Sequence, residues 1–166
     1  MIDETEWAQV RRVFHRSIAS SLHCSIASLG PDGEPLVTPI GSVLLAAPGR
    51  ACYFEVFSQG LGRRIAADPR VSLLAVDSRK ASWLGALFRA RFSERPGVRL
   101  VGTASRERRL ATETEIARFR KRIAPVARLR GARLLWHTLK WVRDVQVQRI
   151  DAIHIGALTA GLHAAP

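Results

Sequence analysis

The sequence predicts a mainly β domain of the α+β class, in which antiparallel strands are joined by short turns and helices are added around them. Residues 25–29 alternate small or polar side chains with apolar ones, as a half-buried strand does. The sequence GPDGEP at residues 30–35 then supplies a proline-preset, glycine-containing reversal, so a β-hairpin is expected. Further strand-like runs occupy residues 51–57, 71–77 and 98–105, and a last one is expected over residues 145–155.

The return arm of the hairpin is expected as one strand over residues 36–45. Pro39 cannot donate a hydrogen bond to a neighbouring strand, and Gly41 lets another backbone or a ligand approach closely. We therefore expect this arm to have an irregular, accessible face.

A short helix is expected after the third strand. Ser58 is a plausible N-cap, residues 59–67 follow it with two adjacent arginines, and the pair Asp68-Pro69 ends the helix. The next strand-like run begins directly afterwards, so the helix connects two strands.

This order of elements resembles the pyridoxamine 5'-phosphate oxidase-like split-barrel flavoproteins. The matching residues are 27–39, which include ASLGPDGEPLVTP, and 65–77, which include DPRVSLL. The resemblance covers residues 17–77 well, and residues 98–107 and 145–161 more loosely. It implies a six-stranded antiparallel split β-barrel with accessory α-helices, which acts as a homodimer and binds FMN non-covalently across the interface.

In that family the FMN phosphate is held by hydroxyls and cationic side chains from the second barrel strand and from the start of the short helix. Hydroxyls, guanidinium forks and the free N–H groups of a helix N-terminus all suit a phosphate dianion. The resemblance also implies that the flavin ring lies against the return arm, with Phe54 or Phe57 covering it. Carried over by position, it assigns cofactor contacts to Thr38, Pro39, Ile40, Ser42, Phe57, Ser58, Arg63 and Arg64.

The sequence departs from the family at two phosphate positions. The oxidases carry an arginine where this chain has Thr38, and an Arg-Lys pair where it has Gly60-Leu61. Arg63 and Arg64 could replace the missing cations, or they could simply form a solvated helix face. In other interpretations FMN is bound weakly, or the ligand is the deazaflavin F420 or a haem ligated by His23 or His137.

Length and composition agree with one domain over residues 1–166. The chain has 166 residues, of which 47% are hydrophobic, and no stretch approaches the roughly 20 apolar residues of a membrane-spanning helix. The N-terminal residues are acidic where a secretory signal would be basic, so a cytoplasmic location is expected. Cys24 and Cys52 are too isolated to indicate a zinc or redox site, and both are expected to be buried reduced thiols. No metal site is expected.

The formal net charge of +12 is concentrated in one region. Residues 78–143 hold 18 Lys or Arg and 4 Asp or Glu, a balance of +14, whereas the remainder has a balance of −2. Two basic helical insertions are expected there, at approximately residues 79–95 and 112–141. We expect their apolar side chains to pack on the barrel or across a dimer: Leu84, Leu87, Phe88, Leu135 and Trp136.

The basic insertions leave several functions open. Contact with an anionic membrane surface is possible but not favoured, and no signature of specific nucleic-acid binding is present. We favour an electropositive rim that holds an anionic cofactor or substrate. The prediction is an FMN-dependent oxidoreductase acting on an unknown small molecule, with no catalytic residue assigned; the alternative is a binding protein without turnover.

Overall fold

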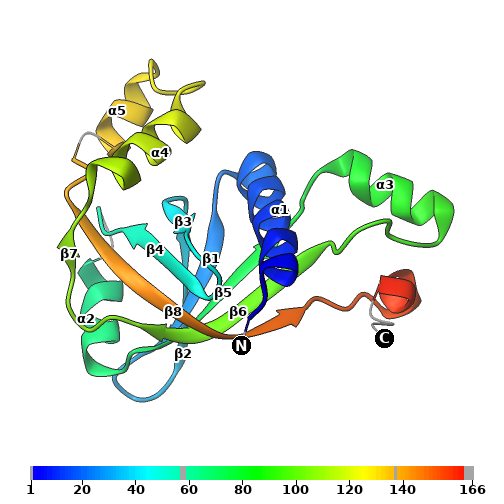
Figure 1. Ribbon diagram of the computed structural model, residues 1–166, viewed down its shortest axis with the longest axis horizontal. Helices are drawn as coiled ribbons and strands as arrows, with labels where there is room; N and C mark the ends of the chain where they lie inside the picture. Colours follow the sequence, from blue (N-terminus) through cyan, green and yellow to red (C-terminus); the bar gives the residue numbers. More distant parts are fainter. Residues whose placement is uncertain (1, 57–58, 137, 163–166) are drawn as a thin grey trace.

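The computed structural model describes residues 2–56, 59–136 and 138–162. These residues form one curled antiparallel sheet of eight strands, in the order β2-β1-β5-β6-β8-β4-β3, with the short β7 paired to β8 (Figure 1). The strands are β1 (Cys24–Leu29), β2 (Pro35–Ile40), β3 (Val43–Leu45), β4 (Arg50–Phe54), β5 (Arg70–Val76), β6 (Gly97–Ala104), β7 (Arg109–Leu110) and β8 (Trp141–Ala152). The predicted fold class is confirmed, with two short strands beyond the six expected.

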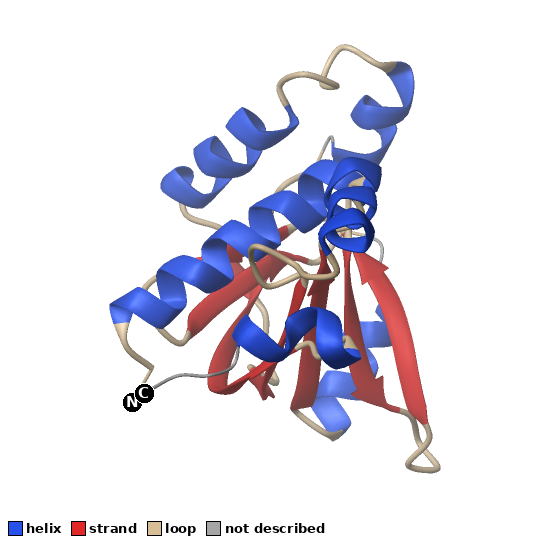
Figure 2. Cartoon of the chain, turned by 90° about the vertical axis from the view of Figure 1, so that its right-hand side faces the viewer, coloured by secondary structure: helices blue, strands red, loops and turns tan. Residues whose placement is uncertain are grey.

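Helices surround the sheet, and α1 lies obliquely across it (Figure 2). In the described residues they are α1 (Glu4–Ser21), α2 (Gln59–Ala67), α3 (Lys80–Arg89), α4 (Glu113–Ile123) and α5 (Arg130–Trp136), followed at the end by a 3-10 helix over Gly156–Leu162. Helix α1 is not among the elements expected from the sequence. Its signals are the N-cap Asp3, which accepts a hydrogen bond from the Glu6 amide at 2.8 Å, and the buried Trp7, Val10 and Phe14 at helical spacing.

The hairpin forms as predicted, but its return arm is two strands and not one. β2 pairs with β1, with Thr38 opposite Ile26, and ends at Ile40. A Cβ on Gly41 would lie 2.7 Å from the Leu22 carbonyl oxygen, so the chain passes close to the end of α1 and turns away from β1. It continues as β3, which pairs with β4 at the other edge of the sheet. The segment expected as one strand over residues 36–45 therefore passes from one edge of the curled sheet to the other.

Strand β8 joins the two halves of the sheet. It is 12 residues long and pairs with β6, β4 and β7. The β6–β8 ladder shifts register between Val101 and Gly102, and a Cβ on Gly102 would overlap the carbonyl oxygen of Gln146. The close approach of the two backbones at this point therefore requires a residue without a Cβ.

The core consists of two apolar clusters. The larger one fills the space between α1, α2 and the concave sheet, with Trp7, Tyr53 and Leu73 fully buried. The smaller one lies between β4, β8 and α4, where Phe119 packs on Phe54 with ring centroids 5.2 Å apart. The basic insertion that contains α4 is therefore anchored to the barrel by its own core.

Helix α3 extends away from the sheet (Figure 1). Leu84, Leu87 and Phe88 are 65%, 63% and 93% exposed, so these side chains do not pack on the barrel, and packing across a dimer stays a prediction. Trp83 and Phe92 contact each other instead, with ring centroids 5.3 Å apart. Among the helices that the structure describes, none has the length and apolar character needed to cross a membrane.

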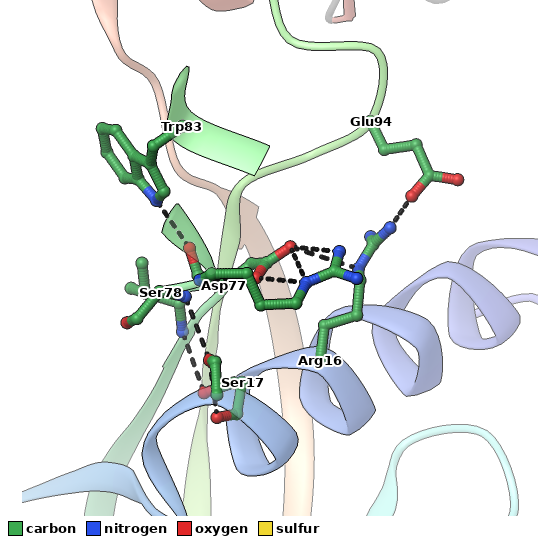
Figure 3. Close-up of polar contacts among 9 residues, drawn as sticks. Arg16, Ser17, Asp77, Ser78, Trp83 and Glu94 are labelled. Atoms are coloured by element: carbon green, nitrogen blue, oxygen red, sulfur yellow. Dashed lines mark hydrogen bonds and ion pairs between the residues drawn. The ribbon is translucent and has the colours of Figure 1, made fainter. Parts of the chain in front are cut away.

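A buried carboxylate ties α1 to the base of α3 (Figure 3). Asp77, only 3% exposed, accepts hydrogen bonds from the Nε atom and the terminal guanidinium nitrogen of Arg79, the latter at 2.6 Å, and forms an ion pair with Arg16. Its backbone carbonyl accepts from the Trp83 indole at 2.7 Å. The hydrogen bonds from Arg79 hold the pKa of Asp77 below its usual range.

Replacement of Gly102 by alanine is expected to destabilise the protein, because the new methyl group would push β6 away from β8. We expect a loss of about 1–3 kcal/mol in the free energy of unfolding, measured by urea denaturation. The matched control is Gly131→Ala in α5, where a Cβ would meet open space. That control should be neutral or stabilising by up to about 1 kcal/mol. Equal losses in both variants would contradict the packing argument.

The contribution of Asp77 to stability should depend on pH. Because its pKa is depressed in the folded state, its contribution is present above the pKa of an unfolded aspartate, about 3.9, and is lost as the pH falls through the folded value. The stability difference between the native protein and Asp77→Asn should therefore be largest near neutral pH and should shrink below about pH 4. Urea titrations over this range test it, and a difference that is constant with pH would contradict it.

Candidate cofactor site

Arg64 of α2 contacts the two strands of the hairpin. Its Nε atom donates a hydrogen bond to the Ser28 hydroxyl at 2.9 Å, and a terminal nitrogen donates to the Thr38 hydroxyl at 3.1 Å. The antiparallel register sets this geometry, because Thr38 lies opposite Ile26 on the neighbouring strand, two residues before Ser28. The structure thus brings together two of the residues predicted to bind the phosphate and adds Ser28. We call these three residues the hydroxyl–arginine cluster.

The positive charge of Arg64 is not compensated by any carboxylate in the part of the chain that the structure describes. Both of its observed partners are neutral hydroxyls, and the guanidinium is half-buried. A terminal nitrogen of Arg64 would lie 3.4 Å from a Cβ on Gly60, so the guanidinium reaches back to the first turn of α2. Unpaired cation, hydroxyl and helix N-terminus together are favourable for binding an oxyanion.

The other predicted cofactor residues are in different environments. Pro39 is exposed on the edge strand β2, and Arg63 is exposed on α2. Ile40 is buried in the main core, and the buried Ser42 hydroxyl donates to the Phe54 carbonyl at 2.9 Å. Two predicted site residues, Phe57 and Ser58, lie outside the described residues.

Phe54, an alternative cover for the flavin ring, is buried against Phe119. Of the two histidines considered as haem ligands, His23 is exposed, and its Nδ1 lies 2.7 Å from the Ser21 carbonyl oxygen. His137 lies outside the described residues.

The sequence model of pyridoxamine 5'-phosphate oxidase matches residues 11–154, which is most of the chain. The chain belongs to the pyridoxamine 5'-phosphate oxidase family. A search of curated proteins finds no match to this sequence.

Solved structures with the same fold include an FMN-binding protein from Syntrophomonas wolfei subsp. wolfei, at 10% identity and a TM-score of 0.58 over 91% of this chain and 94% of that one. HupZ from Group A Streptococcus is 17% identical, with a TM-score of 0.56 over 89% of this chain and 96% of that one. An F420 reductase is 14% identical, with a TM-score of 0.55 over 85% and 94% of the two chains. At these identities the likeness establishes the fold alone.

Leu61, at one of the two positions where the family resemblance places a phosphate cation, is 1% exposed and belongs to the core. Nearby, Glu55 forms a buried ion pair with Arg143, whose Nε lies 2.8 Å from the carboxylate. Arg143 also donates to the carbonyls of Ser105 and Arg106. A Cβ on Gly62 would lie 2.6 Å from Glu55, so this pair packs directly beneath α2.

One group of side chains resembles a metal site: Cys52, Glu115 and Asp144 have potential ligand atoms within 4.8 Å of one another. Arg109 already bridges both carboxylates, with 2.7 Å contacts to each. Hydrogen bonds from Arg109 lower the pKa of Glu115 to about 2, and burial raises the pKa of the Cys52 thiol to about 12. Arg109, Glu115 and Asp144 thus form an ion-pair network, with the protonated Cys52 thiol beside it. Carboxylates already neutralised by an arginine and a protonated thiol are poor ligands for a divalent cation.

Removal of Arg143 should be costly, because Glu55 would remain buried without its cation. We expect Arg143→Met to lower the free energy of unfolding by about 3–5 kcal/mol, and the double variant with Glu55→Met to recover a large part of that loss. The control is Arg149→Met on the same strand, which removes an exposed ion pair to Asp151 and should cost about 1 kcal/mol or less. A double variant as unstable as the single one would contradict this interpretation.

Proposed function

We propose that the protein is a homodimeric flavin-binding protein that holds FMN non-covalently and uses it as an oxidoreductase on a small molecule. The observation that carries this proposal is the position of Arg64. This half-buried cation, which has no acidic partner among the described residues, is held by the hydroxyls of Ser28 and Thr38 at 2.9 and 3.1 Å. It lies on α2, the short helix that the family resemblance associates with the cofactor phosphate.

The residues of the hydroxyl–arginine cluster fit a phosphate group chemically. A guanidinium offers five N–H donors, of which the two hydroxyls take one each. The remaining donors, together with the N-terminus of α2, can bind the oxygens of a dianion. With Leu61 in the core, the site supplies fewer cations than the oxidases do, so the affinity for FMN is expected to be lower.

Strand β2 offers a surface for the apolar ring of the cofactor. It is an edge strand, and its outward-facing Val37 is 66% exposed beside the exposed Pro39. Val37 and Pro39 alternate with Thr38 and so project from the other face of β2, which means that a flat ligand bound through Thr38 would lie across the exposed strand edge, where a second subunit could cover it. When bound, the flavin would supply hydride or electron transfer, whereas the protein binds and orients it and excludes water.

Two further features bear on this proposal. The fold neighbours include an F420 reductase, and the excess of arginine in residues 78–143 would suit a cofactor with an acidic tail, so F420 is the second candidate.

The free cysteines Cys24 and Cys52 are both buried, which is compatible with a location in the reducing cytoplasm.

The proposal is tested by titrating the purified protein with FMN and F420 and following the change in ligand fluorescence. We expect saturable binding of one of them, and we expect Arg64→Ala to weaken it roughly 10- to 100-fold, as expected for the loss of charge-assisted hydrogen bonds. Arg63→Ala is the matched control, because its side chain is exposed on the same helix and should change affinity little. Equal effects of the two variants, or no binding of either ligand, would contradict the proposal.

A further inference from the structure

A cavity of about 760 Å³ opens between α1, β3 and the end of α4, apart from the hydroxyl–arginine cluster. In Figure 1, β3 lies between α1 and the α4–α5 pair. None of the residues of the hydroxyl–arginine cluster lines this cavity. Its basic lining residues are Arg11, Arg12, His15, Arg16, Arg118 and Arg122, and we call it the arginine cleft.

The arginine cleft has no acidic side chain in its described lining. Two of its arginines are neutralised from outside, since Arg11 pairs with Glu4, and Arg16 pairs with acids at the base of α3. For the other three, Arg12, Arg118 and Arg122, the structure shows no carboxylate partner among the described residues. Three positive charges therefore face one cavity with no compensating carboxylate in the described part of the chain.

Arg118 and Arg122 also have a structural role. They stand one helical turn apart on α4 and donate hydrogen bonds to the carbonyls of Leu45 and Val43, at 2.8 and 2.6 Å. These bonds cover the free edge of β3. However, a carbonyl leaves the charge of an arginine in place, and each guanidinium has five N–H donors. Burial and the neighbouring Arg118 lower the pKa of Arg122, so its charge is held in an unfavourable environment that a bound anion would improve.

The remainder of the cleft is apolar. Its walls are formed by Phe14, Ile18, Val43, Leu45, Ile123 and Trp136. The volume falls in the range of about 300–1,000 Å³ that small-molecule sites occupy. A purely inorganic anion would leave most of this wall unused, and a purely apolar ligand would leave the arginines unpaired.

We propose that the arginine cleft binds an amphipathic organic anion, a molecule with an extended apolar body and one terminal carboxylate or phosphate. The apolar body lies against Ile18, Val43 and Ile123, and the oxyanion is bound by Arg12 and Arg118 at the rim. This site is separate from the hydroxyl–arginine cluster and does not depend on the protein binding a flavin.

The experiment is calorimetric titration of the full-length protein with three probes of equal chain length: dodecanoate and dodecyl phosphate below their micellar concentrations, and dodecanol below its solubility limit. We expect saturable binding of at least one of the two anions with one molecule per chain, and at least tenfold weaker binding of the alcohol. The tighter of the two anions identifies the headgroup. An alcohol that binds as tightly as the anions, or an absence of saturable anion binding, would overturn the proposal.

Variants locate the bound anion. The double variant Arg12→Gln with Arg118→Gln should weaken anion binding at least tenfold, whereas Arg120→Gln, an exposed arginine of α4 outside the lining, should leave it unchanged. Equal affinities in these variants would refute the site. Thermal unfolding without ligand verifies that each variant is folded.

A second pair of variants leaves every arginine in place and compares a bulky residue inside the cleft with one outside it. Ala19→Phe adds bulk on an exposed residue of the lining and should block binding, whereas Ala117→Phe, exposed on α4 outside the lining, should not. This pair decides the question if the arginine variants are unstable. Saturation of the protein with FMN beforehand should leave anion binding unchanged. Loss of anion binding after FMN saturation would show that the cleft and the FMN site are the same site. Binding that disappears as the protein dimerises would show that the cleft is a subunit contact.

Discussion

The architecture depends on the pairing of β8 with both halves of the sheet. This strand contacts β6 along one part of its length and β4 along another, so it holds the curled sheet closed on that side. The β6–β8 ladder shifts register near Gly102, where only a residue without a Cβ fits against Gln146. On the opposite side β2 and β3 are the edges of the sheet, and the two ligand sites that we propose lie beside them, although Arg118 and Arg122 cover the edge of β3.

Much of the fold could be predicted because its signals are local. The hairpin follows from alternation and from the turn at residues 30–35, and the short helix follows from its position between two strand-like runs. The division of the return arm at Gly41 could not be predicted, because it results from the approach of the Leu22 carbonyl, a tertiary contact. Helix α1 carried a readable signal in its N-cap and its apolar spacing, which the sequence reasoning did not use.

The candidate site could be predicted only in part. The family resemblance indicated Thr38 and Arg64. Their 3.1 Å hydrogen bond depends on the register of β1 and β2, which the predicted hairpin turn determines. Ser28 shares that face but has no distinguishing sequence feature. The ion pair of Glu55 with Arg143 joins residues 88 positions apart, so no local pattern reports it. The same holds for the arginine cleft, which combines side chains from α1 and α4 that lie far apart in the chain.

The distribution of partners explains why a strongly basic chain forms a stable barrel and still attracts anions. Arg143, which is almost fully buried, is neutralised by the Glu55 carboxylate. Among the more exposed arginines some also pair with carboxylates, as Arg149 does, whereas others donate to backbone carbonyls, as Arg106 does at the end of α2 and Arg118 does at β3. A carbonyl satisfies an N–H donor but leaves the positive charge uncompensated. The excess charge therefore favours anionic ligands beside β2 and β3, where the two sites that we propose lie.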